Sequence, residues 1–316
     1  MSRFLKWALA ALVLLAAGYF AVSGWMLSSI LKNVVTVGGM LSGITTQAGD
    51  PFALNYDGDP RKAFGFAFEE IALPGELGPL PAWIVPGEGG DGTHWMVYAH
   101  GIAGRRESGY KALSVARPLG IDTLLLSYRN DTGAPAAPEG VYGFGVTEWR
   151  DLEAAVKLAE ERGARRIILA GDSMGGAIIG EFLRNSTHVT WVTAAVLDSP
   201  ALDIRAVVHG FAVRIGFPLP GAVAWVARQI MPWRVGIDFS DAVTLPVLAS
   251  GPRHLFDVHG AADSVVPVSV SDELRARRVD MTYLRTGADH VLSWQENPER
   301  YRSALDTFLR GVVGGN

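Results

Sequence analysis

A serine between two glycines is the feature of this sequence that most strongly suggests chemistry. Ser173 lies in the stretch AGDSMGG, after the apolar run IILA and before the helix-like AIIGEFL. A serine hydroxyl becomes a useful nucleophile when a base takes its proton and a sharp strand-to-helix turn exposes it. Gly171 and Gly175 give the spacing G-x-S-x-G that allows such a turn. The same turn could instead bind phosphate at the helix N-terminus or have no chemical role. Whether Ser173 is a nucleophile therefore depends on whether the chain also supplies a suitable acid and histidine.

A nucleophilic Ser173 requires an acid and then a histidine, each at the end of a later strand. His290 follows the last predicted strand, and Asp263 follows the strand before it, in VHGAADSVVP. Asp198, at the end of an earlier strand, remains an alternative acid, whereas Asp289 is too close to His290 in sequence to reach its Nδ1. The histidines after Ser173 that fit the order less well are His188, His209, His254 and His259. The order Ser173, Asp263, His290 therefore predicts a catalytic triad.

Two backbone N–H groups should stabilise an oxyanion beside the serine. Met174 follows the nucleophile at the start of the helix and can supply the first. The stretch AHGIAG follows an early strand, and its glycine lets the backbone turn inward, so we predict the Ile102 N–H as the second. We expect His100 to hold this loop by hydrogen bonds rather than to act in catalysis.

The elements that position these residues alternate between strands and helices. Strand-like runs are predicted over 64–73, 80–86, 93–101, 121–130, 164–173, 191–200, 254–267 and 280–290. Helices are predicted over 147–163, with Thr147 as a possible N-cap, and over 174–185. This alternation indicates an α/β fold with a mostly parallel sheet covered by helices on both faces. Ligand chemistry then belongs at the carboxyl ends of the strands.

One long apolar segment interrupts the alternation. Residues 203–244 include Pro218, Pro220 and Pro232 and lie between two strands expected to be neighbours. The segment is longer than an ordinary connection, so we interpret it as a small helical cap inserted over the strand ends. Ordinary crossover helices with a long loop are the alternative.

The composition excludes several classes of function. The 316 residues are 49% hydrophobic and 19% charged, which fits one large folded domain or two modest ones. A net charge of −4 with scattered basic residues argues against nucleic-acid binding. Since there is no cysteine, disulfides, thiolate metal sites and cysteine nucleophiles are excluded. We predict neither a cofactor nor a metal.

The first 32 residues form a separate unit. The 25 residues between Lys6 and Lys32 carry no charge and would cover about 37 Å as a helix, more than a hydrocarbon core of about 30 Å. We predict a single-pass transmembrane signal-anchor with a cytoplasmic N-terminus and an extracytoplasmic catalytic domain, because Arg3 and Lys6 precede the span. A signal peptide cleaved after Ala21-Val22-Ser23 is the alternative and would give a secreted protein. Residues 33–60 are predicted to be a tether to the domain at 61–316.

The motifs AHGIAG, AGDSMGG, VHGAADSVVP and GADHV together resemble the α/β-hydrolase superfamily of serine hydrolases over most of residues 60–316. With the N-terminal span, the chain is most similar to membrane-anchored α/β-hydrolase-domain proteins. The resemblance implies Ser173 as nucleophile, His290 as base and then acid, and Asp263 as the residue that orients it. It also implies substrates such as lipid esters or acyl thioesters. Family members often have Gly-x-Gly-His around the histidine, whereas Asp289 precedes His290 here, which leaves the local loop in question.

The predicted function is a serine esterase that acts through an acyl-enzyme on a small-molecule or lipid ester. A serine peptidase with the same triad is one alternative, although no subsite for a peptide terminus can be identified. A non-catalytic, membrane-tethered ligand-binding protein is the other. A dehalogenase or epoxide hydrolase would normally have aspartate in place of Ser173.

Overall fold

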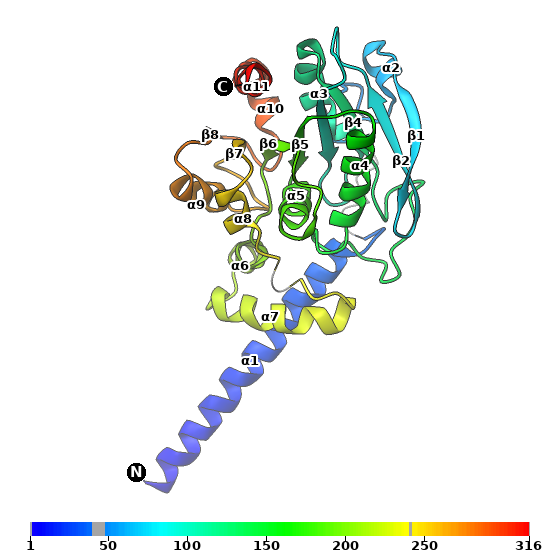
Figure 1. Cartoon of the computed structure of the whole chain (residues 1–316). Helices are drawn as coiled ribbons and strands as arrows, with labels where there is room; N and C mark the ends of the chain where they lie inside the picture. The colour runs from blue at the N-terminus through cyan, green and yellow to red at the C-terminus, as the bar shows by residue number, and fades with distance from the viewer. Residues whose placement is uncertain (1, 40–47, 240–241, 316) are drawn as a thin grey trace.

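The core of the fold is one eight-stranded sheet, seen in a computed structural model that describes residues 2–39, 48–239 and 242–315 (Figure 1). The strand order is β1-β2-β4-β3-β5-β6-β7-β8. β1 and β2 are antiparallel to their neighbours, and the pairs from β4–β3 to β7–β8 are parallel. The strands are β1 Glu69–Gly75, β2 Gly78–Val85, β3 His94–Ala99, β4 Asp122–Leu126, β5 Arg166–Asp172, β6 Val192–Asp198, β7 His254–Gly260 and β8 Thr282–Thr286. The predicted mostly parallel sheet is therefore confirmed.

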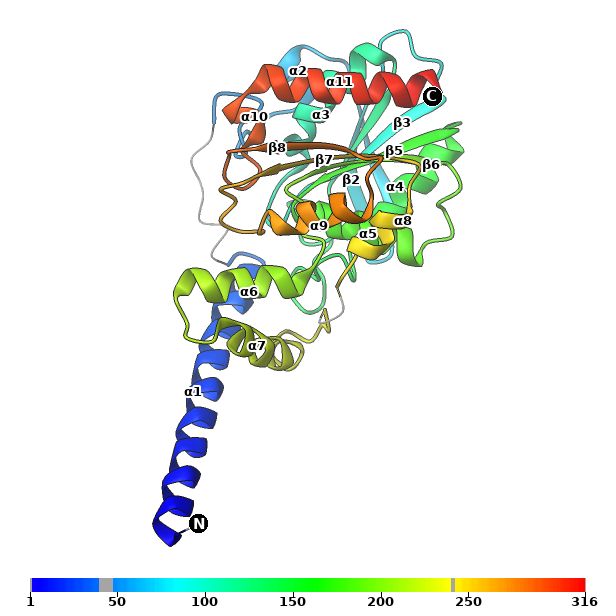
Figure 2. The ribbon, with the colours of Figure 1, turned by 90° about the vertical axis from the view of Figure 1, so that its left-hand side faces the viewer.

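Helices cover both faces of this sheet, as Figure 2 shows. One face carries α2 Pro60–Phe64, α3 Tyr110–Ala116, α10 Ser293–Glu296 and α11 Pro298–Gly314. The other face carries α4 Trp149–Glu161, α5 Met174–Asn185, α8 Leu245–Ser250 and α9 Ser269–Arg277. The interior of β3 and β5 is apolar throughout, because residues on both faces of these strands meet a helical layer. Two buried apolar clusters result, one on each side of the sheet.

The segment between β6 and α8 contains two helices that lie outside the layer of α5, α8 and α9. They are α6 Ile204–Ile215 and α7 Pro220–Val235 (Figures 1 and 2). α7 packs against α6 and against the N-terminal helix α1, Arg3–Val35. Residues 240–241 of the predicted cap lie outside the described residues.

The N-terminal helix α1 has two distinct parts. From residue 3 to residue 18 its side chains are exposed, and Figure 1 shows this part projecting from the domain. Further along, Leu27, Leu31 and Val35 are buried in the same core cluster as the sheet. At the last residue of α1, Val35 O accepts from Tyr142 N at 2.8 Å, which holds the helix end against the domain. The predicted tether at 33–60 includes residues 40–47, which lie outside the described residues.

Two local predictions are wrong in ways that capping explains. The strand predicted over 64–73 begins only at Glu69, and Phe64 belongs to the short helix α2, where the Asp59 side chain accepts from Lys62 N at 2.7 Å and Pro60 occupies the first turn. Helix α4 begins at Trp149, with Glu148 rather than Thr147 at the N-cap position. The Glu148 carboxylate is buried and accepts from backbone N–H groups of the preceding loop.

Candidate active site

Ser173 lies at a sharp bend between β5 and α5. Its backbone has φ 51° and ψ −117°, a conformation that non-glycine residues rarely adopt. A Cβ at position 171 would lie 2.8 Å from Ala99 O, and one at position 175 would lie 2.1 Å from the same oxygen. Glycine is therefore required at both positions for the bend to pack against the end of β3. This explains the G-x-S-x-G spacing in physical terms.

The loop after β8 brings a histidine to the serine. His290 Nε2 lies 2.9 Å from Ser173 Oγ, although the two residues are 117 positions apart in sequence. On the other side of the ring, His290 Nδ1 lies 2.7 Å from Asp263 Oδ2. With Nδ1–H donating to the carboxylate, Nε2 is free to accept the serine proton. The structure thus brings together the three residues that the sequence order selected.

The Asp263 carboxylate is fully buried and has four hydrogen-bond donors around it. Oδ1 accepts from Val265 N at 2.8 Å and Val266 N at 2.7 Å, and Oδ2 faces His290 and His259. Burial by itself would raise the pKa of this carboxyl, but the hydrogen bonds from the two histidines and from the backbone hold the pKa well below its ordinary value. Asp263 is therefore ionised at neutral pH, as a group that orients a histidine must be.

His259 is a second histidine that contacts the Asp263 carboxylate. In sequence it fits the order of a triad less well than His290 does. His259 Nε2 lies 3.1 Å from Asp263 Oδ2 and 3.0 Å from Val266 O. Because a carbonyl oxygen only accepts, the proton of this ring is on Nε2. Its Nδ1 lies 2.7 Å from Ser271 Oγ. The strand end FDVHG contains two polar residues, Asp257 and His259, which are both buried, and this was the sequence signal for a buried polar network.

Asp198, the alternative acid, lies in a different network. Its Oδ2 is 3.6 Å from Lys111 Nζ and accepts from Tyr301 OH at 3.2 Å. Burial raises the pKa of Asp198, with Lys111 acting in the opposite direction. Lys111 Nζ also donates to Val291 O at 3.2 Å, so this buried pair supports the backbone beside His290 from behind.

Asp289, where family members often have glycine, fixes the histidine loop. Its Oδ1 accepts from Ser264 N at 2.7 Å and from His290 N at 2.7 Å. Burial alone would raise the pKa of Asp289, but these two backbone hydrogen bonds and a third from the Ser264 hydroxyl hold the pKa below its ordinary value. Asp289 thus connects the loop that carries His290 to the loop that carries Asp263.

The loop after β3 passes close to the serine. A Cβ at Gly101 would lie 3.0 Å from Ser173 Cβ, so the backbone just before Ile102 is in contact with the bend. His100 is fully buried, and its ring lies 2.8 Å from Gly101 O and 2.7 Å from Asp131 Oδ2. This agrees with its expected role of holding the loop. The assignment of Ile102 and Met174 as oxyanion donors stays a prediction.

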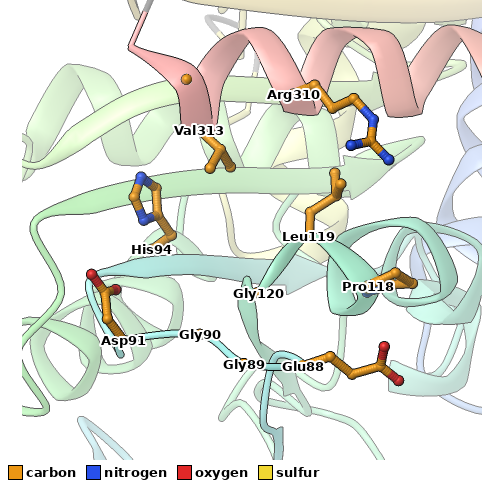
Figure 3. Close-up of a pocket in the computed structure, with 11 residues that line it drawn as sticks. Glu88, Gly89, Gly90, Asp91, His94, Pro118, Leu119, Gly120, Arg310 and Val313 are labelled. Atoms are coloured by element: carbon orange, nitrogen blue, oxygen red, sulfur yellow. The ribbon is translucent and has the colours of Figure 1, made fainter.

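A cavity of about 650 Å³ lies at the other end of the sheet (Figure 3). It is lined by Asp91, His94 and Arg310, among others, and His94 begins β3. The cavity is therefore at the amino ends of the strands and away from Ser173. Over the described parts of the chain, no group of three or more His, Asp or Glu side chains could hold a metal ion.

Comparison with known proteins gives a result for the fold only. Neither a protein-family model nor a curated protein matches the chain. Solved structures do match. An esterase from Pyrococcus furiosus has a TM-score of 0.61 and 20% identity, covering 84% of this chain and 98% of its own. A Butyrivibrio proteoclasticus protein with bound ferulic acid has a TM-score of 0.60 and 16% identity, covering 77% of this chain and 99% of its own.

A third solved structure, from Xanthomonas campestris, is described as an α/β serine hydrolase without a lid. It has a TM-score of 0.54 and 18% identity, covering 77% of this chain and 94% of its own. In this chain the sheet has a parallel core, and Ser173 lies at the bend after β5. The chain has the α/β-hydrolase fold.

Proposed function

We propose that this protein is a serine hydrolase that cleaves carboxylic esters through Ser173, His290 and Asp263. The observation that carries the proposal is the continuous line of contacts from Ser173 Oγ to His290 Nε2 at 2.9 Å and from His290 Nδ1 to Asp263 Oδ2 at 2.7 Å. A structural role for three such residues would not require this order of atoms at the carboxyl ends of three strands.

The proposed reaction has two stages. Ser173 Oγ attacks the ester carbonyl carbon while its proton moves to His290 Nε2, and the N–H groups of Met174 and Ile102 stabilise the oxyanion. His290 then gives the proton to the leaving alcohol, which leaves an acyl group on Ser173. Water attacks this acyl-enzyme with His290 again as the base, and the acid is released. Asp263 stays ionised throughout and stabilises the charged His290 ring.

The ester class is supported by the solved neighbours, several of which are described as esterases. Within that class we propose lipid esters or acyl thioesters, on the interpretation of residues 203–244 as a cap. This segment offers apolar side chains such as Phe211 and Phe217 in partly buried positions. An acyl chain would gain about 25 cal/mol per Å² of apolar surface buried there.

We further propose that α1 remains attached as a single-pass anchor, with its N-terminus cytoplasmic and the catalytic domain outside. The helix is long and apolar enough to cross a membrane, a property that a signal sequence shares. Retention is supported because α1 continues without a break through the possible cleavage site at 21–23, and Tyr19 OH donates to Pro218 O at 2.6 Å. N-terminal sequencing of the membrane-bound protein tests this, and a start at Gly24 would contradict it.

A fluorophosphonate probe tests the proposed nucleophile. The wild type should be labelled, Ser173→Ala should not be, and Ser303→Ala, at an exposed serine on α11, should be labelled as the wild type is. Absence of labelling in a folded wild type would instead support a non-catalytic binding protein.

A substrate panel tests the bond that is cleaved. p-Nitrophenyl esters of increasing chain length should be hydrolysed with a preference for medium or long chains, and peptide p-nitroanilides should be poor substrates. Rates that are highest for acetyl and vanish by octanoyl would contradict the acyl pocket. Faster cleavage of anilides than of esters would favour a peptidase.

A further inference from the structure

The exposed part of α1 is too short to cross a bilayer without the domain approaching the lipid. The contacts of α1 with the domain begin at Tyr19, which donates to Pro218 O in the turn between α6 and α7. From Trp7 to Gly18 the helix covers only about 18 Å, whereas a hydrocarbon core is about 30 Å thick. About 20 residues are needed, which extends the span from Trp7 to near Met26.

The close packing of α7 on α1 fixes the position of the domain along the span from Trp7 to Met26. A Cβ at Gly24 would lie 2.4 Å from Val226 Cγ1, so the two helices touch closely at this point. Further along, Arg234 Nη1 donates to Ser28 Oγ at 2.7 Å. Since α1 and α7 are packed together, a membrane that covers α1 up to Met26 must also meet the turn before α7.

The turn that would meet the membrane has suitable side chains. We call residues 213–219 the docking turn. Val213, Ile215 and Leu219 are 52%, 44% and 67% exposed. The single charged side chain of the turn, Arg214, donates to Ser264 O at 2.7 Å. Exposed apolar side chains of this size beside an apolar helix are typical of a surface that enters a membrane interface.

The exposed face of α7 continues this surface. One face of α7 presents three exposed side chains at spacings of four residues, Trp225, Gln229 and Trp233. None of these three side chains is charged. Tryptophan and tyrosine favour the boundary between headgroups and acyl chains. Tyr19 and Trp225 are thus suited to the region in which the docking turn would lie.

We propose that the docking turn and the first turns of α7 insert into the headgroup region of the same bilayer that α1 spans. The inference rests on the proposed membrane anchor and adds a second contact with lipid. Arg214 connects the docking turn to Ser264, the residue after Asp263. The loop that carries the acid would therefore stand next to the lipid surface.

The absence of cysteine makes a direct test simple. Single cysteines are introduced into the full chain at Leu219 and Ile215 of the docking turn, at Val13 in the exposed part of α1, and at Val279, which is 76% exposed in the loop before β8. Each is labelled with an environment-sensitive fluorophore and reconstituted into phosphatidylcholine nanodiscs with and without doxyl-labelled lipid. Fluorophosphonate labelling of each variant at the wild-type level shows that the site is folded.

Lipid-borne quenching at Leu219 and Ile215 should exceed that at Val279 by at least about threefold, as expected for side chains at the acyl boundary. Strong quenching at Val13 combined with quenching at both docking-turn positions no greater than at Val279 would overturn the inference and leave the anchor intact. Absence of quenching at Val13 would overturn the proposed anchor itself and the inference with it.

Discussion

Replacing Asp263 by asparagine should reverse the direction of the hydrogen bond that prepares His290. The carboxylate oxygen Oδ1 accepts from two backbone N–H groups, those of Val265 and Val266. An asparagine can keep these bonds only by placing its carbonyl oxygen there, so its NH₂ group takes the place of Oδ2. It then faces His290 Nδ1 and the Nε2–H of His259. The ring proton of His290 therefore moves to Nε2. A protonated Nε2 can no longer accept the proton of Ser173.

The expected fall in kcat of Asp263→Asn follows from the interactions that the variant loses. The variant loses a correctly oriented base and the charge that stabilises the protonated ring, but it keeps the serine and the proposed oxyanion donors. We expect kcat to fall by about 10² to 10⁴, since the same substitution in another serine hydrolase triad costs about 10⁴. At 1.36 kcal/mol for each factor of ten, this is about 3 to 5.5 kcal/mol of transition-state stabilisation.

The matched control is Asp198→Asn, because both carboxylates are buried, that of Asp198 at the end of β6 and that of Asp263 just after β7. Asp198 is next to Lys111 and not next to His290, so its replacement should lower the thermal midpoint and change kcat by less than about tenfold. Ester hydrolysis by both variants is measured below their thermal midpoints, with fluorophosphonate labelling rates in parallel. If Asp263→Asn retained more than a tenth of wild-type turnover while Asp198→Asn lost a hundredfold, the assignment of the acid would be refuted.

Substitutions at three further positions test the surroundings of the site and the contact between α1 and α7. Burial raises the pKa of Asp257 from 3.8 to about 6, so the native state binds its proton more tightly and stability is lost as pH rises from about 4 to about 6. Asp257→Asn should thus raise the unfolding free energy by up to about 3 kcal/mol at pH 8 and by almost nothing at pH 4. Urea denaturation at both pH values measures this, and the same increase in unfolding free energy at pH 4 and pH 8 would contradict it. His259→Leu, which removes a donor to Asp263, should lower kcat more than KM rises, whereas His259→Gln should recover part of the loss. Gly24→Val should destabilise the protein by about 1–3 kcal/mol through its clash with Val226, seen as a lower thermal midpoint in detergent.

The triad candidates could be predicted because each one depends on a local pattern that the fold preserves. An apolar strand, a tight turn and a helix around Ser173 can be recognised without knowing the rest of the chain, and polar residues after later strands must meet at the same sheet edge. The choice of Asp263 over Asp198 followed from this order of strands. The structure adds the contacts themselves, including the hydrogen bonds by which Asp289 connects the acid and base loops.

The role of His259 could not be predicted in the same way. Its ring reaches Asp263 four residues later, across the turn that ends β7, and is fixed on its other side by Ser271 of α9. Both contacts depend on how the turn and the helix pack in three dimensions. Sequence spacing alone gives no such distance, so a histidine in a strand end is as easily interpreted as an ordinary core residue.

The division of α1 into an exposed part and a buried part could not be predicted from hydropathy either. Lipid and a protein core are both apolar, so Leu14, which is exposed, and Leu27, which is buried, look alike in sequence. The difference is visible only in the small residues Gly24 and Ser28, which allow α7 to approach. Because this packing joins helix and domain over several turns, α1 is a fixed support for the domain at this joint. The angle between the active site and a membrane would then be set by the α1–α7 contact, and a variant that loosens this contact should affect hydrolysis of bilayer-bound esters more than hydrolysis of soluble ones.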